Sequence, residues 1–343
     1  MMNTSQKLIA LLSGAALLSV SSLTAQTATT APVGYVSVTV NGTGGVGSSA
    51  ISVIGVPMVN AADTSGVLTA VAGTTLTSSG ASLTPGAFAS THYVQITSGT
   101  NTGISATITG NTATTLTTAQ DISSLLVGTE TFEVRAYNTL ADVFGAANES
   151  GIGSGANAAA ADEILVYNGA GFDIYYYQEG AAFGGIGWRT STNGFTDQSS
   201  ALLPSGLGLV VKRKQSADVD VVISGSVLTT NSIVPVEAGV NWMSGANPID
   251  YTLADYFGAD GGDLQSGANA EAADEILVPK AGGGFDIYYY QEGASFGGIG
   301  FRSSVNGFTD ASATVLATVG SGFVLKRKGT AYNQVDATPL AAN

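Results

Sequence analysis

The stretch that decides the fold is GFDIYYYQEG, which occupies Gly171–Gly180 and recurs unchanged at Gly284–Gly293. Successive side chains of an extended strand point to opposite faces. This alternation predicts a core face that carries the middle tyrosines, Tyr176 and Tyr289, together with Phe172, Ile174 and Gln178 in the first copy. It predicts an outer face formed in the first copy by Asp173, Tyr175, Tyr177 and Glu179.

The repeated stretch belongs to a longer module that spans residues 139–214 and returns at residues 252–328. Both copies contain, in the same order, TLAD, SGANA, ADEILV, FGGIG and NGFTD, and they end in VKRK and LKRK. Self-similarity of several motifs in one order is the signature of a duplicated folded unit. Each copy begins with a capping box, Thr139–Asp142 or Thr252–Asp255, which predicts a short helix ended by Gly145 or Gly258.

The composition favours strands and turns over helices, since the chain has 46 Gly and only 10% charged residues. We therefore predict an all-β protein with a strand-rich head region followed by two tandem β-sandwich or barrel-like modules, each with one short capped helix. The expected divisions are a signal peptide at 1–25, an N-terminal β region at 26–138, the first module at 139–214, connecting strands at 215–251, the second module at 252–328 and a C-terminal strand or tail at 329–343.

The N-terminus has the pattern of a cleavable secretory signal. Lys7 precedes an apolar run from Leu8 to Val20, and Ala25 is a small residue suited to cleavage. The run is shorter than the roughly 20 residues that a membrane-spanning helix requires. We expect export to the periplasm, the cell surface or the extracellular space, with no transmembrane helix after cleavage of the signal.

Charge and residue usage exclude several functions. The formal charge of −14 disfavours nucleic acid as a partner, because phosphate binding depends on clustered cations. The absence of cysteine excludes disulfides, thiolate chemistry and cysteine metal sites. His92, the single histidine, is predicted to be an ordinary strand residue. The basic triplets Lys212–Lys214 and Lys326–Lys328 are predicted to be charged strand ends that discourage pairing with other chains.

A family resemblance rests on several short motifs in one order: PVGYVSVTV, THYVQITSGTNTG, ITGNTATTLT, ADEILVYNG, YYY, GWR and SGLGLVVKRK. Together they resemble an uncharacterised family of exported proteins found chiefly in verrucomicrobial bacteria. The resemblance covers residues 32–214, and the second module repeats the C-terminal half of that pattern. The family has no established activity, so the resemblance implies export and assigns no site residue.

The predicted outer face suggests a binding surface for sugars. Two tyrosines at alternate positions lie ~7 Å apart and are flanked by carboxylates, an arrangement that suits stacking on a glycan or another polymer. The same rings can instead pack against cross-strand neighbours without any ligand. The candidate ligand-binding residues are Tyr175, Tyr177, Trp188 and Arg189 in the first module, and Tyr288, Tyr290, Phe301 and Arg302 in the second.

Catalytic and metal sites find less support in the sequence. Asp173 and Glu179 would lie ~20 Å apart on a straight strand, whereas glycosidase carboxylates lie roughly 5 to 10 Å apart. Asp260 and Asp263 form an alternative Ca²⁺ site in a glycine-rich loop, but the first module lacks the matching carboxylates. We expect no catalytic residue and, apart from this Ca²⁺ alternative, no metal or cofactor.

The sequence therefore predicts an exported, non-enzymatic structural or adhesive β-repeat protein of the cell surface or extracellular matrix. Its expected partners are a polysaccharide or other surface proteins. The alternative is a carbohydrate- or polymer-binding protein that uses the paired tyrosine faces, and a hydrolase is the third possibility.

Overall fold

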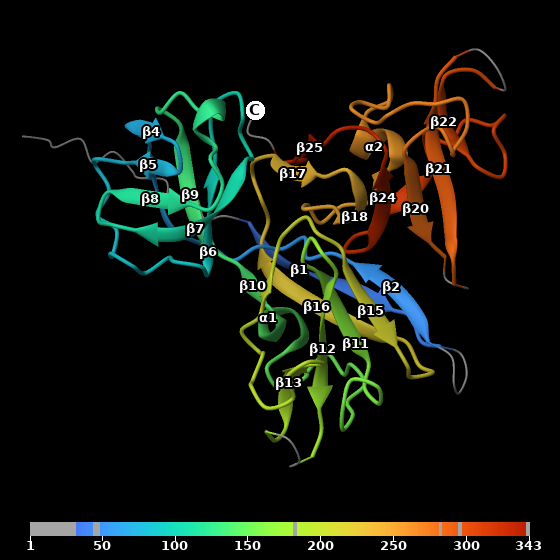
Figure 1. Cartoon of the computed structure of the whole chain (residues 1–343), viewed down its shortest axis with the longest axis horizontal. Coiled ribbons are helices and arrows are strands. Elements are labelled where there is room, and N and C mark those ends of the chain that lie inside the picture. Colours follow the sequence, from blue (N-terminus) through green and yellow to red (C-terminus); the bar gives the residue numbers. More distant parts are fainter. Residues whose placement is uncertain (1–31, 44–48, 181–183, 281–282, 294–296, 341–343) are drawn as a thin grey trace, which may run out of the picture. The chain divides into compact units, whose positions relative to one another are not determined.

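The computed structural model describes residues 32–43, 49–180, 184–280, 283–293 and 297–340 (Figure 1). The predicted signal peptide at 1–25 lies outside these residues. The all-β prediction is confirmed, because strands form the sheets and the described residues contain only two short α-helices and one 3-10 turn. The helices are α1 (Leu140–Phe144) and α2 (Leu253–Phe257).

Both helices begin with the predicted capping box. The Thr139 hydroxyl accepts a hydrogen bond from the Asp142 amide, and the Asp142 carboxylate accepts one from the Thr139 amide at 2.8 Å. Thr252 and Asp255 repeat this arrangement in α2. The helices bury Leu140 and Phe144 or Leu253 and Phe257 against the sheets. Within the described residues, no helix is long and apolar enough to cross a membrane.

The repeated strands form two five-stranded antiparallel sheets of the same order. The first is β13-β12-β11-β15-β2 and the second is β22-β21-β20-β24-β18. The strands of the first are β2 (Ala50–Ile54), β11 (Glu163–Tyr167), β12 (Phe172–Gln178), β13 (Gly187–Thr190) and β15 (Leu209–Arg213). Those of the second are β18 (Gly239–Ser244), β20 (Glu275–Pro279), β21 (Phe285–Gln291), β22 (Gly300–Ser303) and β24 (Gly322–Arg327).

Two-stranded sheets complete each unit. Longer pairs are formed by β1 (Val33–Val40) with β16 (Val219–Ser226), and by β17 (Ser232–Val236) with β25 (Tyr332–Asp336). Shorter pairs are formed by β10 (Asn138–Thr139) with β14 (Leu202–Leu203), and by β19 (Tyr251–Thr252) with β23 (Val315–Ala317). The duplicated unit thus extends beyond the identical motifs, into the predicted N-terminal region, connecting strands and tail.

We call residues 33–58 with 138–226 the first unit, and residues 232–336 the second unit. Each has a hydrophobic core of its own. A seven-stranded sheet, the head, is inserted between β2 and β10 in the order β3-β9-β6-β7-β8-β5-β4. Its strands, which surround a third core, are β3 (Ala62–Val67), β4 (Ala70–Ala72), β5 (Thr75–Thr77), β6 (His92–Ile96), β7 (Ser105–Asn111), β8 (Thr115–Thr118) and β9 (Thr131–Ala136).

Candidate functional site

The outer tyrosines of the first unit face the hydrophobic core. Tyr175 lies opposite Ile164, which is fully buried, and packs against the core cluster. Tyr177 lies opposite Trp188, and their ring centroids are 5.2 Å apart in an edge-to-face contact. The predicted assignment of the two faces of β12 is therefore wrong. Aromatic side chains occur on both faces of β12. Alternation alone therefore could not show which face packs against α1 and the β1–β16 pair.

The second unit repeats this arrangement. Tyr288 lies opposite the buried Ile276, and the Tyr290 ring is 5.1 Å from the ring of Phe301. Burial is the main cause that raises the pKa of Tyr288 and Tyr290, and of Tyr175 in the first unit. Trp188 and Phe301 are completely buried. The predicted aromatic residues therefore pack against the two cores, where Tyr177, Trp188 and Phe301 are buried and Tyr175, Tyr288 and Tyr290 are half-buried.

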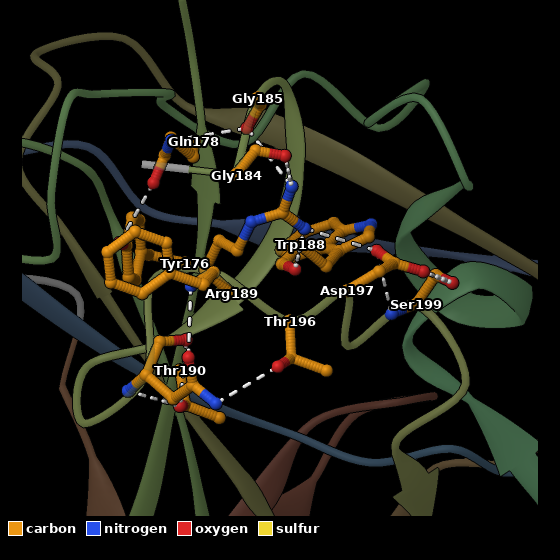
Figure 2. A network of polar contacts seen from close by, with 12 residues as sticks. Tyr176, Gln178, Gly184, Gly185, Trp188, Arg189, Thr190, Thr196, Asp197 and Ser199 are labelled. Carbon is orange, nitrogen blue, oxygen red and sulfur yellow. Dashed lines mark hydrogen bonds and ion pairs between the residues drawn. The ribbon is translucent and has the colours of Figure 1, made fainter. Parts of the chain in front are cut away.

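The opposite face of β12 carries a buried polar network (Figure 2). The Tyr176 hydroxyl donates to Gln178 Oε1 at 3.2 Å, and Gln178 Nε2 donates to the Gly185 carbonyl at 3.1 Å. Tyr289 and Gln291 repeat these contacts in the second unit. Tyr176 and Tyr289 are buried, as predicted, but among polar groups beneath a loop instead of in the apolar core.

Arg189 holds the loop that contains Gly184 and Gly185 in place. Its side chain is only 4% exposed, and Nη2 donates to the carbonyls of Gly184 and Gly185 at 2.7 and 3.1 Å. Nη1 donates to the Trp188 carbonyl at 2.8 Å and approaches Asp197 Oδ1 at 3.4 Å (Figure 2). Arg302 makes the same set of contacts in the second unit. Both arginines were predicted ligand-binding residues, and the structure buries both as supports for a loop.

The loop that Arg189 holds packs closely on the NGFTD turn. Gly184 has φ +85°, and a Cβ atom there would lie 2.6 Å from the Phe195 carbonyl oxygen. Gly297 has φ +93° and the same relationship with Phe308, at 2.7 Å. Only glycine combines this left-handed backbone with so close an approach. The described part of this loop, which starts at Gly184 or Gly297, is thus fixed against the turn in both units.

The polar side chains of the NGFTD turn are hydrogen bonded within the turn. Asn193 accepts from the Phe195 amide and donates to the Thr196 hydroxyl, both at 3.0 Å. Asp197 accepts from the Ser199 hydroxyl and lies beside Arg189. The apolar side chain that the turn presents to solvent is Phe195, which is 68% exposed, beside the exposed polar side chains of Asn193, Thr196 and Asp197.

Each unit therefore exposes the same two apolar side chains on two adjoining loops. We call these pairs the apolar loop tips: Ile186 with Phe195, and Ile299 with Phe308. Ile186 and Ile299 are 67% and 66% exposed, and Phe308 is 70% exposed. The apolar loop tips were not predicted from the sequence, because the tyrosines were taken as the candidate binding residues. The signal was present in the sequence, since FGGIG and NGFTD are identical in both copies.

The basic triplets lie at the ends of β15 and β24, as predicted, and they also form ion pairs that the sequence did not predict. Arg213 Nη1 lies 2.8 Å from Asp162 Oδ2, and both side chains are buried. Asp162 also accepts from the amides of Gly153 and Lys214, at 2.7 and 2.6 Å. Lys212 and Lys214 bind Glu163. The triplet therefore binds the acidic pair of ADEILV, and the second unit repeats the buried pair with Arg327 and Asp274.

The other predicted chemical groups do not form a metal site. In the part of the chain that the structure describes, no group of three or more His, Asp or Glu side chains could hold a metal ion. Asp260 and Asp263 are exposed, and the Asp263 backbone carbonyl accepts from Arg327. His92 lies in a strand, where it bridges Thr91 and Asp63, at 2.8 and 3.0 Å from their side-chain oxygens. The contact between His92 and Asp63 links β6 to β3, which lie on either side of β9.

No protein-family model, curated protein or solved structure matches this chain. The fold and the repeated site define it as a duplicated all-β protein with two equivalent apolar loop tips. Its function must therefore be inferred from the geometry of the chain.

Proposed function

We propose that the chain is an exported structural or adhesive protein of the cell surface or extracellular matrix, and that it attaches to partner proteins through its two apolar loop tips. One observation supports this most directly. The same exposed pair of isoleucine and phenylalanine recurs in both units, on loops that a buried arginine and a close glycine contact hold in place.

Exposed apolar side chains are common when they occur singly, so exposure alone carries little weight. The tips differ because the supporting contacts are reproduced along with the exposed residues. A loop that is already ordered loses less conformational entropy when it binds. Two linked sites also bind a surface more tightly than either site alone, by a factor of roughly 10² to 10⁴ when both engage. Duplication of a weak apolar contact therefore suits adhesion.

The chemistry of the tips favours protein over a charged polymer. The polar atoms of Asn193 and Asp197 are engaged in hydrogen bonds, although both side chains are exposed, and the apolar groups beside them are Phe195 and Ile186. The net charge of −14 opposes binding to polyanions. The partner that fits is a protein surface with an apolar pocket for an aromatic side chain.

The test measures retention of the mature protein on washed envelopes of the cells that produce it. Phe195→Asp combined with Phe308→Asp should lower retention by roughly 100-fold, and either change alone should lower it less, because one tip remains. Val127→Asp is the matched control, since Val127 is an exposed apolar residue of the head, at 82%. Equal retention of the double variant and the control would exclude the tips as the attachment site.

Treatment of the envelopes identifies the partner class. We expect protease treatment to remove retention and periodate oxidation of sugars to leave it. The reverse result would favour carbohydrate binding, the second candidate, for which the exposed Phe195 and Phe308 rings would supply the stacking surface in place of the tyrosines that pack against the cores. Retention that survives both protease and periodate treatment would contradict both candidates.

A further inference from the structure

The two units contact each other through equivalent segments. In the first unit β2 pairs with β15, and Ile54 lies opposite Leu209. In the second unit β18 pairs with β24, and Met243 lies opposite Phe323. Ile54 and Met243 are therefore equivalent positions. By the same register, the turn at 206–208 before β15 is equivalent to the turn at 320–322 before β24.

Two kinds of backbone contact between these segments have a counterpart with the units exchanged, whereas the bond from the Gly208 amide to the Trp242 carbonyl, at 3.0 Å, occurs on one side. The Gly55 amide donates to the Gly320 carbonyl at 2.8 Å, and the Ser244 amide donates to the Gly206 carbonyl at 3.2 Å. Ile54 forms an antiparallel bridge with Ser321, and Met243 forms one with Leu207. An interface in which the same patch is used on both sides is isologous, as in a twofold dimer.

The glycines of the two turns obey the same symmetry. Gly206 and Gly320 have φ +77° and +73°. A Cβ atom at Gly206 would lie 2.8 Å from Val234 on β17, and one at Gly320 would lie 2.3 Å from Val38 on β1, the corresponding strand. The turns thus approach the opposite unit so closely that both require glycine.

A second pair of glycines lies where the units meet. Cβ atoms at Gly208 and Gly322 would lie 2.9 and 2.7 Å from Val53 Cγ1, and 2.9 and 2.6 Å from the Met243 carbonyl oxygen. Equivalent positions in the two units therefore meet the same two groups. Both turns therefore lie against the place where the edge strands β2 and β18 meet, and neither has room there for a side chain.

We infer that the two units are related as the subunits of a twofold dimer, and that the surface formed by the edge strand (β2 or β18) and the glycine turn is self-complementary. The partner of this surface is a second copy of the unit. In this chain the second copy is part of the same polypeptide. A unit separated from the other therefore binds another copy of itself. This inference does not depend on the proposed adhesive role.

The experiment uses a protease site inserted after Thr229, an exposed residue between β16 and β17. The C-terminal half contains the complete second sheet and its own core, so it retains the elements needed to fold alone. We expect the cleaved halves to remain together. After separation in denaturant and refolding, the C-terminal half should form a homodimer in native mass spectrometry. A C-terminal half that stays monomeric, at concentrations where remixed halves associate, would overturn the inference.

A measurement on the intact chain tests the symmetry even if the separated half does not fold. Gly208→Ala and Gly322→Ala should lower the thermal unfolding midpoint by equal amounts, because each places a Cβ against the same two groups. Gly110→Ala is the control, since a Cβ there meets nothing within 4 Å and the backbone is not left-handed. Clearly unequal shifts of the two interface variants, or shifts no larger than the control, would contradict a twofold interface.

Discussion

Arg213 and Asp162 form a buried ion pair 2.8 Å long at the end of β15, and Arg327 with Asp274 forms its repeat at the end of β24. The carboxylate of Asp162 also accepts two backbone amides, so its charge is compensated on several sides. Such a pair joins the acidic start of β11 to the last residues of β15. It stabilises the fold only while all its members are present.

Removal of one member of this pair should be strongly destabilising. Arg213→Ala leaves the Asp162 carboxylate buried without its cation, for which we expect a loss of about 3 to 5 kcal/mol in the free energy of unfolding. Urea denaturation monitored by circular dichroism measures it. The double change Arg213→Met with Asp162→Leu should cost less than Arg213→Ala alone, because no uncompensated charge remains. A double variant less stable than the single one would show that the pair does not act in this way.

The buried arginine under each loop tip gives a second prediction. Arg189→Met keeps much of the apolar stem but removes the donors to Gly184 and Gly185. We expect faster hydrogen exchange at residues 184–187 and a loss of about 2 to 4 kcal/mol, since several hydrogen bonds to a charged group disappear. The repeat supplies the control, because Arg302→Met should change exchange at 297–300 and leave the first tip unaffected. Unchanged exchange at 184–187 would contradict the role of Arg189 in holding the loop.

The repeated motifs made much of the fold predictable. The duplication, the all-β class and both capping boxes follow from local patterns of identical residues, such as Thr139 with Asp142. The full extent of each unit was not predictable in this way. Pairing of β1 with β16 joins residues such as Val38 and Val221, which are far apart in the chain and carry only ordinary alternation. The insertion of the head between β2 and β10 further separates the parts of the first unit.

The candidate site was predicted less well than the fold. The sequence shows that Tyr175 and Tyr177 share a face, but only tertiary packing decides that this face meets Trp188 and the core. The basic triplets were placed at strand ends correctly, yet their partners depended on the antiparallel register that brings Lys212 opposite Glu163. Identical loops in both copies were a better guide to the exposed residues than the aromatic strand.

Glycine in the FGGIG segment provides a matched pair of positions. Gly184 and Gly185 both have φ +85°, but a Cβ at Gly184 meets Phe195 whereas one at Gly185 meets nothing within 4 Å. Gly185→Ala should cost about 1 kcal/mol for the left-handed backbone alone. Gly184→Ala should cost about 2 to 4 kcal/mol, because the close contact adds to the same backbone strain. Equal losses in chemical denaturation would show that the approach to Phe195 is not constraining.

Asp336 predicts a pH dependence of the stability of the second unit. Its carboxylate is buried and accepts from the Ala246 amide, the Asn247 amide group and the Tyr251 hydroxyl, at 2.6, 3.0 and 2.8 Å. Burial is the largest cause of the change and raises the pKa of Asp336, although these hydrogen bonds act in the opposite direction. The nearby Tyr256 is also buried, and the Asp336 charge contributes to its raised pKa.

A raised carboxyl pKa means that the folded state binds the proton more tightly than the unfolded chain does. The contribution of Asp336 to stability is therefore complete below the unfolded pKa of about 3.9 and is lost as the pH rises through the folded pKa. Carboxylates with lowered pKa, such as Asp255 beside Thr252, act in the opposite sense and lose their contribution on acidification. The total pH profile combines these opposing effects, so a single variant must isolate Asp336.

Asp336→Asn supplies that comparison, because it keeps the shape of the side chain and removes its titration. The difference in unfolding free energy, wild type minus variant, should fall as the pH rises from about 4 to 8 and should level off once the folded carboxyl is ionised. Asp220→Asn on the exposed face of β16 serves as the control for the loss of one surface carboxylate. A wild-type advantage that grows with pH would mean that the hydrogen bonds to Asp336 outweigh its burial.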